Sequence, residues 1–321
     1  MKNFAITGIA GYVVPRHLKA IKETGNDLIA ALDPHDSVGI MDSYFPRSSF
    51  FTEFERFERY LEMLRRKEPD NHIHYLSICS PNHLHDAHIR LALRVGADAI
   101  CEKPLVLNPW NLDALHQIEE ETGKKVYNIL QLRVHPSIIE LKKKLELHNG
   151  KKHDVVLTYI TSRGLWYKYS WKGDQAKSGG IATNIGIHLF DLLMWLFGDI
   201  EISEVHFSQP DKMSGFLSLT NANVRWYLSL DNRDLPENAI VNSQSTYRSL
   251  VIDGEEVEFT NGFTDLHKKV YEDILNGKGF GIEDARSAIE AVYNIRNAKL
   301  TTNYGFVHPF IEQNNEVFSA L

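Results

Sequence analysis

The sequence has few cysteines, no long apolar run and no export signal. Cys79 and Cys101 are the only cysteines among 321 residues, and each lies near the end of an apolar run, where we expect a buried, reduced thiol. Residues 1–7 lead straight into a strand pattern without a basic leader, and no apolar run approaches the roughly 18 residues of a membrane-spanning helix. We therefore expect a cytoplasmic protein with no membrane partner.

Positive charge is also scarce. Lys and Arg number 35 against 42 Asp and Glu, which gives a formal net charge of -7 and a pI of about 6.1. Without a global positive field, a nucleic acid is not an expected partner. The composition, 43% hydrophobic and 24% charged, is that of an ordinary globular protein, and the length favours two domains.

Short apolar runs alternate with amphipathic stretches over the first 130 residues. The runs are "FAIT", "LIAAL", "IHYLSIC", "ADAIC" and "KVYNIL", and the intervening stretches 15–23, 53–66, 83–95 and 111–121 have helical spacing. This βαβ alternation predicts an α/β domain of the Rossmann type with a doubly wound parallel sheet. We place this nucleotide-binding domain at residues 1–125.

The pattern changes beyond residue 150. Five strands are expected at 154–161, 201–208, 215–220, 224–230 and 247–253, joined by short polar turns. Helical patterns at 181–196, 264–275 and 283–299 are expected to cover one side of the resulting sheet. We therefore predict an α+β domain at residues 126–321 with a large, mostly antiparallel open sheet, for substrate binding and oligomerisation.

A glycine turn follows the first strand and opens a helix. Gly8 and Gly11 begin the stretch "GIAGYVV", a partial match to the dinucleotide fingerprint in the required strand–turn–helix context. Asp33 ends the second strand, 22 residues after Gly11, where a carboxylate can accept hydrogen bonds from ribose hydroxyls. Because no Lys or Arg adjoins Asp33 to neutralise a 2′-phosphate, we expect NAD rather than NADP.

The stretch "AICEKPL" places two charges at the end of an apolar strand. In a parallel sheet of this kind Gly8, Asp33, Ser80 and Glu102-Lys103 all follow the carboxyl ends of strands, where ligands bind. Lys103 is therefore expected near the nicotinamide, where an ammonium can bond a substrate hydroxyl and stabilise the alkoxide that forms as hydride leaves.

Three motifs resemble the Gfo/Idh/MocA superfamily, which includes glucose-fructose oxidoreductase and inositol dehydrogenase. They are "CEKP" at 101–104, "SPNHLH" at 80–85 and "SGGIATNIGIHLFD" at 178–191. Within the superfamily, "GIAGYVVPRH", "QLRVHPS", "SRGLWYKYSWKGD" and "YRSLVIDGEEVEF" are similar to the bacterial UDP-N-acetyl-2-amino-2-deoxyglucuronate dehydrogenases. The resemblance covers both expected domains.

The resemblance implies NAD-dependent oxidation of the C3 hydroxyl of UDP-N-acetylglucosaminuronic acid to a ketone, in biosynthesis of a diacetamido-uronic acid for surface polysaccharide such as the O-antigen of lipopolysaccharide. It also implies recycling of NADH by 2-oxoglutarate, a homotetramer and a cis Lys103-Pro104 bond. Lys103 and His188 are the implied catalytic residues. The superfamily has Asp where this chain has Asn184, which can orient a hydroxyl but cannot take a proton.

The full set of predicted site residues follows. The expected cofactor-binding residues are Gly8, Gly11, Tyr12, Asp33, Ser80, Asn82, His85, Glu102, Lys103, Trp171 and Lys172, and the expected substrate-binding residues are Lys103, Arg163, Asn184, His188 and Tyr247.

A cationic stretch lies between residues 163 and 177. Arg163, Lys168, Lys172 and Lys177 are interleaved there with Trp166, Tyr167, Tyr169 and Trp171. This mixture suits an anionic diphosphate with sugar and uracil rings, although an exposed surface loop is an equally good interpretation. Arg163 is the preferred anion contact because a guanidinium forms a paired fork with a carboxylate or phosphate.

Three alternatives stay open. His83, His85 and His88, with His72 and His74 nearby, could ligate zinc in a hydrolase, although we expect no metal because a carboxylate-rich second cluster is missing. A non-catalytic NAD sensor is possible because a Rossmann domain does not imply turnover, and the paired Lys103 and His188 argue against it. The third is a dehydrogenase of another sugar or a cyclitol.

Overall fold

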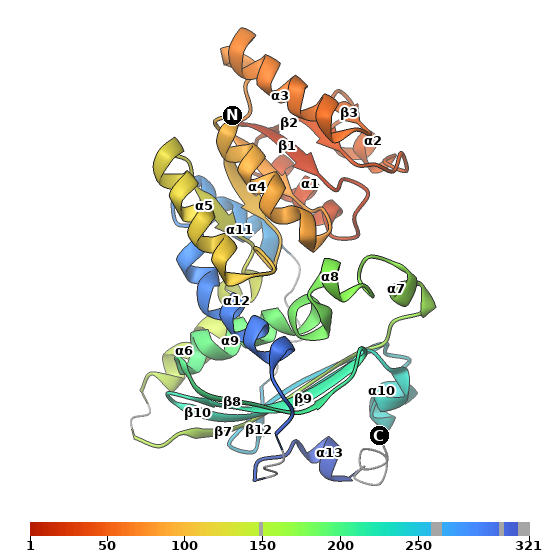
Figure 1. The fold of residues 1–321 in the computed structure, drawn as a ribbon, viewed down its shortest axis with the longest axis vertical. Helices are drawn as coiled ribbons and strands as arrows, with labels where there is room; N and C mark the ends of the chain where they lie inside the picture. The colour runs from red at the N-terminus through yellow and green to blue at the C-terminus, as the bar shows by residue number, and fades with distance from the viewer. Residues whose placement is uncertain (148–149, 258–264, 302–304, 314–321) are drawn as a thin grey trace. The chain divides into compact units, whose positions relative to one another are not determined.

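The chain divides into two compact units, each with its own sheet and core. The computed structural model describes residues 1–321 except 148–149, 258–264, 302–304 and 314–321 (Figure 1). Unit 1 comprises Met1–Val134 and Phe263–Arg286, and unit 2 comprises His135–Gly262 and Ser287–Leu321. The first unit is therefore discontinuous in sequence, with its second segment lying beyond the expected boundary at residue 125.

Unit 1 is built on a six-stranded parallel sheet. Its strands are β1 (Asn3–Thr7), β2 (Asp27–Leu32), β3 (Ser49–Phe51), β4 (Tyr75–Ile78), β5 (Asp98–Cys101) and β6 (Val126–Asn128). They are ordered β3-β2-β1-β4-β5-β6, and every pairing is parallel. The predicted doubly wound α/β domain is confirmed.

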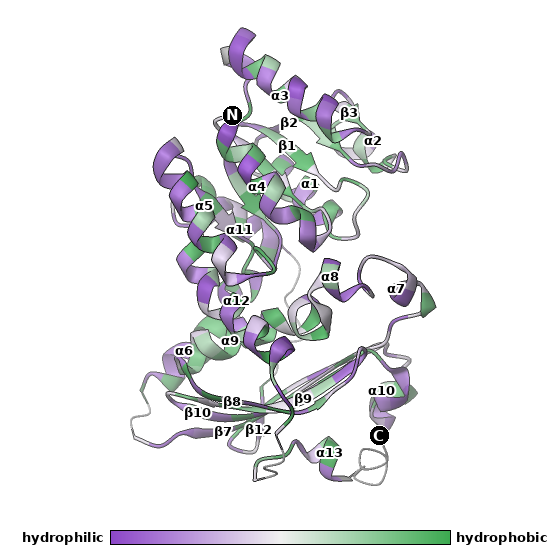
Figure 2. Cartoon of the chain, in the orientation of Figure 1, coloured by the Kyte–Doolittle hydropathy of each residue, from purple (hydrophilic) through white to green (hydrophobic). Residues whose placement is uncertain are grey.

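Helices cover both faces of this sheet. They are α1 (Val14–Glu23), α2 (Ile40–Tyr44), α3 (Phe54–Lys67), α4 (His85–Arg94), α5 (Pro109–Thr122) and α11 (Leu266–Leu275), with short 3-10 turns η1 (Pro69–Asn71), η2 (Asn82–Leu84) and η3 (Gln131–Val134). Helices α1 and α11 pack with Phe4, Ile6 and Ile100 in one buried cluster. On the opposite face, His88 of α4 bonds Thr7, the residue that follows Ile6. Hydrophilic and hydrophobic segments alternate along α3 and α4 (Figure 2), as expected for helices with one buried side.

The placement of the helix at 264–275 in the second domain was wrong. Its helical part is α11, and Leu266, Val270 and Ile274 are buried in the core of unit 1 beside α1. Burial of each of these aliphatic side chains stabilises the packed helix by about 1.5–3 kcal/mol. Together they are enough to hold α11 against the sheet that covers its apolar face. The periodicity showed the apolar face but not its partner.

Unit 2 has a six-stranded mixed sheet. Its strands are β7 (His153–Thr161), β8 (Ile200–Ser208), β9 (Lys212–Leu219), β10 (Ala222–Ser229), β11 (Thr246–Ile252) and β12 (Glu255–Glu256), in the order β12-β11-β7-β10-β9-β8. Only the central β7–β10 pair is parallel among these pairings, and the others are antiparallel. The predicted mostly antiparallel sheet is confirmed.

The helical elements of unit 2 include one deeply buried helix. They are α6 (Pro136–Leu145), α7 (Leu165–Tyr169), α8 (Gln175–Ser178), the π-helical turn η4 (Ala182–Gly186), α9 (Ile187–Phe197), η5 (Asn232–Asp234), α10 (Glu237–Val241) and α13 (Pro309–Gln313); α12 (Ile282–Asn297) runs from one unit into the other. Helix α9, largely apolar in Figure 2, packs on the sheet through Phe190, whose ring lies 5.3 Å from that of Trp226. A Cβ on Gly186 would lie 2.7 Å from Leu228 Cδ1, so a larger residue there would have to displace that side chain.

One helical stretch has the length and composition of a membrane span. Gln175–Phe197 has a mean hydropathy of 1.4 over its most apolar window, and 78% of that window is buried inside the protein. This burial is typical of the core helix of a folded domain, which passes the same compositional test.

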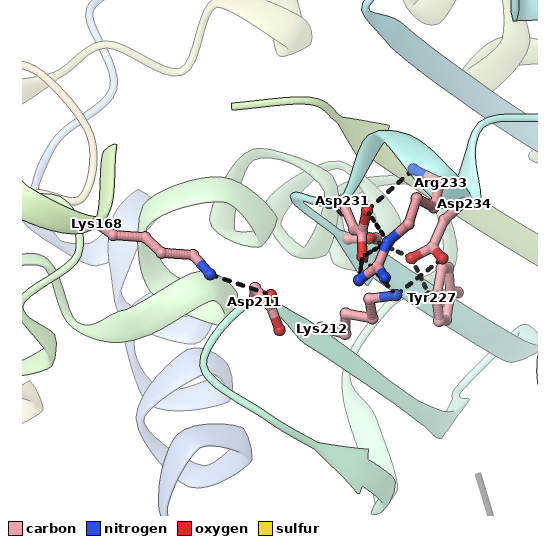
Figure 3. A network of polar contacts seen from close by, with 8 residues as sticks. Lys168, Asp211, Lys212, Tyr227, Asp231, Arg233 and Asp234 are labelled. Carbon is pink, nitrogen blue, oxygen red and sulfur yellow. Dashed lines mark hydrogen bonds and ion pairs between the residues drawn. The ribbon is translucent and has the colours of Figure 1, made fainter. Parts of the chain in front are cut away.

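A buried ion network closes the loop after β10 (Figure 3). Lys212 Nζ lies 3.1 Å from Asp231 Oδ2 and 2.8 Å from Asp234 Oδ1, while Tyr227 donates its O–H to Asp234 Oδ2 at 2.7 Å. Burial and the neighbouring carboxylate raise the pKa of Tyr227, so its hydroxyl stays a donor. The network ends beside Leu230, whose carbonyl accepts from the backbone N–H of Arg163. It therefore supports the segment where the cationic stretch begins.

Replacing Lys212 with Met is expected to destabilise the protein by about 3 kcal/mol, because the buried Asp234 carboxylate would lose the cation that it contacts, while Asp231 would keep only the exposed Arg233. The Lys212 side chain is only 15% exposed, whereas that of Lys168, 3.9 Å from Asp211, is 67% exposed. Lys168→Met is the matched control and should cost less than about 1 kcal/mol. Urea unfolding of both variants measures the difference, and equal losses would contradict the assignment.

Candidate functional site

The glycine loop of unit 1 is a tight turn between β1 and α1. Gly8 has a φ of +77°, and a Cβ there would lie 2.5 Å from the Cys79 carbonyl oxygen. A Cβ on Gly11 would lie 2.9 Å from the Gly8 oxygen. Both positions therefore require glycine, and the turn leads directly into a helix N-terminus, as a pyrophosphate-binding loop does.

Asp33 is fixed beside this loop. Its side chain is buried, and its two oxygens accept hydrogen bonds from Ala10 N at 3.0 Å and His35 N at 2.9 Å. A carboxylate offers about four lone-pair sites, so acceptor capacity for ribose hydroxyls is left over. Tyr12 lies on the same loop with 86% of its surface exposed, and the Arg16 guanidinium lies 5.9 Å from its ring centroid.

The histidines after β4 hold separate hydrogen bonds. His88 Nδ1 lies 2.9 Å from Ser80 Oγ and 3.0 Å from Thr7 Oγ1, whereas both ring nitrogens of His85 face backbone carbonyls. Asn82 is buried in the intervening 3-10 turn. The zinc interpretation finds no support in this arrangement, because both ring nitrogens of His85 and the Nδ1 of His88 face hydrogen-bond partners within the protein.

His85 ties two loops together. Its Nδ1 lies 2.7 Å from the Pro104 oxygen, and its Nε2 lies 2.8 Å from the Ser80 oxygen. Burial lowers the pKa of His85, while the two carbonyl acceptors raise it, and burial prevails. The Lys103-Pro104 peptide bond is cis, which confirms the sequence expectation. The turn that carries Lys103 is thus attached to the loop that carries Ser80.

Glu102 is a buried carboxylate with two histidine partners. Its Oε1 lies 3.0 Å from His17 Nε2 and 3.0 Å from His267 Nε2, and its Oε2 lies 3.3 Å from the backbone N of Lys103. Burial raises the pKa of Glu102, but the bonds from His17 and His267 outweigh it and hold that pKa well below its usual range. A direct contact of Glu102 with NAD stays a prediction.

The His17, Glu102 and His267 ligand atoms lie within 4.8 Å of one another, a spacing that a metal ion could bridge. Both nitrogen–oxygen separations are hydrogen-bond distances, however, and ring N–H groups that donate to one oxygen satisfy the cluster without an ion. We therefore interpret it as a hydrogen-bonded network.

In unit 2, Asn184 and His188 lie at the start of the buried glycine-rich helix. Asn184 belongs to the π-helical turn, a rare element that occurs often at functional sites, and His188 follows it in α9. Asn184 Nδ2 donates to the Tyr167 hydroxyl at 2.7 Å. Burial raises the pKa of Tyr167, and the nearby Arg163 charge opposes this shift. Tyr167 thus links Asn184 to the cationic stretch.

The cationic stretch presents one cation over aromatic rings. Lys172 Nζ lies 5.2 Å from the Trp166 ring centroid and 5.6 Å from that of Trp171. Arg163 is exposed, and Lys177 lies 3.8 Å from Asp174, the cap of α8. The stretch is a surface segment that combines positive charge with flat apolar rings.

The structure separates Tyr247 from its neighbour Arg248. Tyr247 packs with Ile160 and Tyr227 on one sheet face. Arg248 alternates to the other face, which carries Trp226 and therefore α9, and its guanidinium lies 5.0 Å from the Tyr159 ring centroid. Within unit 2, Arg248 therefore shares the sheet face of the His188 helix, and the role predicted for Tyr247 stays a prediction.

Lys103 belongs to unit 1 and His188 to unit 2, so their pairing as catalytic residues stays a prediction. Sequence reasoning missed His17 and His267, which lie 85 and 165 residues from Glu102. The available signal was weak: His17 ends the stretch "GIAGYVVPRH", and His267 lies in a helix that had been assigned to the other domain.

Two models of one oxidoreductase family match the chain: its NAD-binding Rossmann fold over residues 2–129 and its C-terminal alpha/beta domain over residues 151–238. Crystal structures of the WlbA (WbpB) dehydrogenase from Thermus thermophilus, in complex with NAD and alpha-ketoglutarate or with NAD and UDP-GlcNAcA, are 54% and 53% identical to it. They cover 97% of this chain and all of theirs, with a TM-score of 0.93. The WlbA dehydrogenase from Bordetella pertussis, at 18% identity, covers 91% of this chain and 94% of its own, with a TM-score of 0.73, which shows the shared fold.

The chain spans about half the length of the first curated relatives that it matches. These are an oxidoreductase of Bacillus subtilis, 25% identical over 62% of this chain and 47% of its own, and the D-glucoside 3-dehydrogenase of Escherichia coli, 24% identical over 56% and 57%. The two family models and the full-length structural match agree with the glycine loop, Asp33 and the Glu102-Lys103 strand end. The chain therefore belongs to the Gfo/Idh/MocA family of oxidoreductases, and its first 130 residues carry the family's NAD-binding Rossmann domain.

Proposed function

We propose that this protein is a UDP-N-acetylglucosaminuronic acid dehydrogenase that oxidises the sugar C3 hydroxyl to a ketone. The observation that carries the proposal is the similarity to the Thermus thermophilus dehydrogenase over 97% of this chain. Its structure with NAD and UDP-GlcNAcA is 53% identical to this chain, and its structure with NAD and alpha-ketoglutarate is 54% identical. In the cell the reaction takes place in the cytoplasm and supplies a precursor of a diacetamido-uronic acid for surface polysaccharide.

The residues of unit 1 suit NAD. Gly8 and Gly11 allow the backbone to approach a pyrophosphate, and Asp33 keeps acceptor capacity for ribose hydroxyls. NAD, when bound, accepts the hydride that leaves the sugar carbon. Lys103 holds the reacting hydroxyl and stabilises the negative charge that develops on its oxygen, and His188 takes the hydroxyl proton.

Asn184 orients the sugar in this scheme. Its side-chain amide already donates to Tyr167, so its carbonyl oxygen is directed by that bond, and an amide cannot act as the acid or base. The proton therefore passes through His188 rather than through residue 184. Arg163 and Lys172 meet the diphosphate and the uronate, with Trp166 and Trp171 as flat surfaces for the rings.

Reoxidation of NADH to NAD by 2-oxoglutarate, whose ketone takes the hydride and is reduced to a hydroxyl, is part of the proposal, because the Thermus thermophilus protein was solved with NAD and alpha-ketoglutarate together. The two substrates share a carboxylate and an oxidisable or reducible carbon, so one set of cations can receive each in turn. A homotetramer is proposed from the family resemblance alone. Nucleotide release and identification on the purified protein, followed by turnover with UDP-N-acetylglucosaminuronic acid, tests the proposal most directly.

Lys103→Met and His188→Asn are each expected to lower turnover by about 10²- to 10⁴-fold while NAD affinity stays near that of the wild type, because the first removes the cation that stabilises the developing oxyanion and the second removes the group that takes the proton. Initial rates with UDP-N-acetylglucosaminuronic acid measure the first effect, and nucleotide titration measures the second. Lys67→Met, an exposed position at the end of α3, is the control. Full activity in either test variant would remove that residue from the mechanism.

Asp33→Asn is expected to weaken NAD binding by about tenfold or more, because hydrogen bonds to a charged acceptor contribute about 1.5–3 kcal/mol each. The exposed Asp36→Asn serves as the matched control, since it removes the same charge from the same loop. Wild-type protein should bind NADP much more weakly than NAD. Comparable affinity for both nucleotides would refute the role assigned to Asp33.

Arg163→Ala is expected to reduce discrimination between the uronate and UDP-N-acetylglucosamine by about 10²-fold, because the guanidinium can pair with the uronate carboxylate but not with a neutral hydroxymethyl. The ratio of kcat/KM for the two sugars measures this preference, with Lys177→Ala as the control. Equal efficiency of the wild type with both sugars would defeat the uronate assignment. An unchanged preference in Arg163→Ala would transfer the role to Lys172 or Arg248.

A further inference from the structure

Three segments distant in sequence meet at one carboxylate. Glu102 follows β5, His17 lies in α1 directly after the glycine loop, and His267 lies in α11 of the returning segment. His17 is fully buried, and Glu102 and His267 are 7% and 5% exposed. Such burial of a carboxylate is costly unless hydrogen bonds compensate it, so the two imidazoles are what permit a charge at this position.

The hydrogens of the cluster can be assigned without conflict. If each Nε2 carries a proton, both rings donate to Glu102 Oε1. His17 Nδ1 then accepts from the Tyr271 hydroxyl at 2.7 Å, and the Tyr271 oxygen accepts from Ser77 Oγ at 2.7 Å. The Ser77–Tyr271–His17–Glu102 chain is thus satisfied with a neutral His17 ring and a negative charge on Glu102.

The charged residue, Glu102, directly precedes Lys103 in the sequence. Glu102 Oε2 faces the Lys103 backbone N at 3.3 Å, and the next residue is attached from the other side of the sheet by the bond between His85 and the Pro104 oxygen. The turn that carries Lys103 is therefore held on the α1/α11 face through Glu102 and by α4 through His85. A neighbouring anion favours the charged form of an ammonium, and Glu102 directly precedes Lys103 in the sequence.

We propose that His17 and His267 are positioning residues that hold Glu102 as a buried anion, and that this anion sets both the orientation of Lys103 and the pH range over which Lys103 works. The inference rests on the proposed role of Lys103. It adds to that role a contribution from His17 of α1 and His267 of α11. Helix α1, which follows the glycine loop, would then also help to position Lys103.

The other groups around Glu102 do not compete with it for charge. His17 from α1 and His85 from α4 have pKa values lowered chiefly by burial, and burial raises those of Cys79 after β4, Cys101 in β5 and Tyr271 from α11. His17, Cys79, Cys101 and Tyr271 are therefore neutral near pH 7, while Glu102 is ionised, and a neutral His85 donates to only one of the two carbonyls that it faces. His267 and the Lys103 backbone complete the set of facing donors.

Glu102→Gln is the direct test, because glutamine keeps the shape and an oxygen that both histidines can donate to. Loss of the anion should move the limb of the kcat/KM–pH profile that belongs to Lys103 to lower pH by about one unit. The direction is the same whether Lys103 acts as ammonium or as free amine, because in both cases its pKa falls. Thermal unfolding of the variant confirms that the protein is folded at each pH measured.

A matched series separates positioning from stability. His17→Leu removes the donor and should lower kcat by about tenfold, whereas His17→Gln retains an N–H at the same reach and should recover most of the loss. Tyr271→Phe is the control: it removes a bond in the same chain but leaves both donors to Glu102, so the pH profile should stay that of the wild type. If His17→Leu does not fold, Glu102→Gln and His17→Gln still decide the question.

The outcomes distinguish this inference from the proposed function. If Lys103→Met retains full turnover, the proposed catalytic role fails and the inference falls with it. If Lys103→Met is inactive but Glu102→Gln keeps the wild-type pH profile, the proposed function stands and the inference is overturned. A profile that moves to lower pH in Glu102→Gln, with recovery of kcat in His17→Gln, supports it.

Discussion

A carboxylate buried beneath the strand end that carries Lys103 is the constraint on which unit 1 depends. Water cannot solvate Glu102 there, so the protein must supply donors from within, and it does so from two helices. Helix α1 can deliver His17 only if the glycine loop turns sharply before it, and α11 can deliver His267 only if its apolar side packs on the same sheet face. One charge thus couples the glycine loop, the carboxyl end of β5 and the returning helix α11.

The fold of unit 1 was largely readable from the sequence because each strand is a short apolar run and each helix repeats apolar residues at three- and four-residue spacing. The strand-end positions of Gly8, Asp33 and Lys103 followed from the topology of a parallel sheet. The partner of α11 could not be predicted in this way, since periodicity identifies the buried side of a helix and not the surface that buries it.

Side-chain partners were the least predictable part of the site. Nothing local marks His17 or His267 as donors to Glu102, because their proximity arises only when α1 and α11 share a sheet face. In unit 2 the motif around Asn184 and His188 was recognisable, but the π-helical turn and the bond to Tyr167 depend on packing of Gly186 against β10. Strand alternation places the consecutive residues Tyr247 and Arg248 on opposite faces of the sheet. Which of the two shares a face with α9 depends on the strand register, which the sequence does not give.

The discontinuity of unit 1 bears on how the protein is made. A ribosome releases all six strands of the parallel sheet long before it reaches α11, so the nascent sheet has one face on which the sites for Leu266, Val270 and Ile274 are empty and Glu102 lacks one of its two donors. The last native contacts of the NAD-binding unit therefore await synthesis of most of unit 2. A fragment cut after the last parallel strand would expose the apolar surface that α11 covers in the full chain, although the two units have distinct sheets.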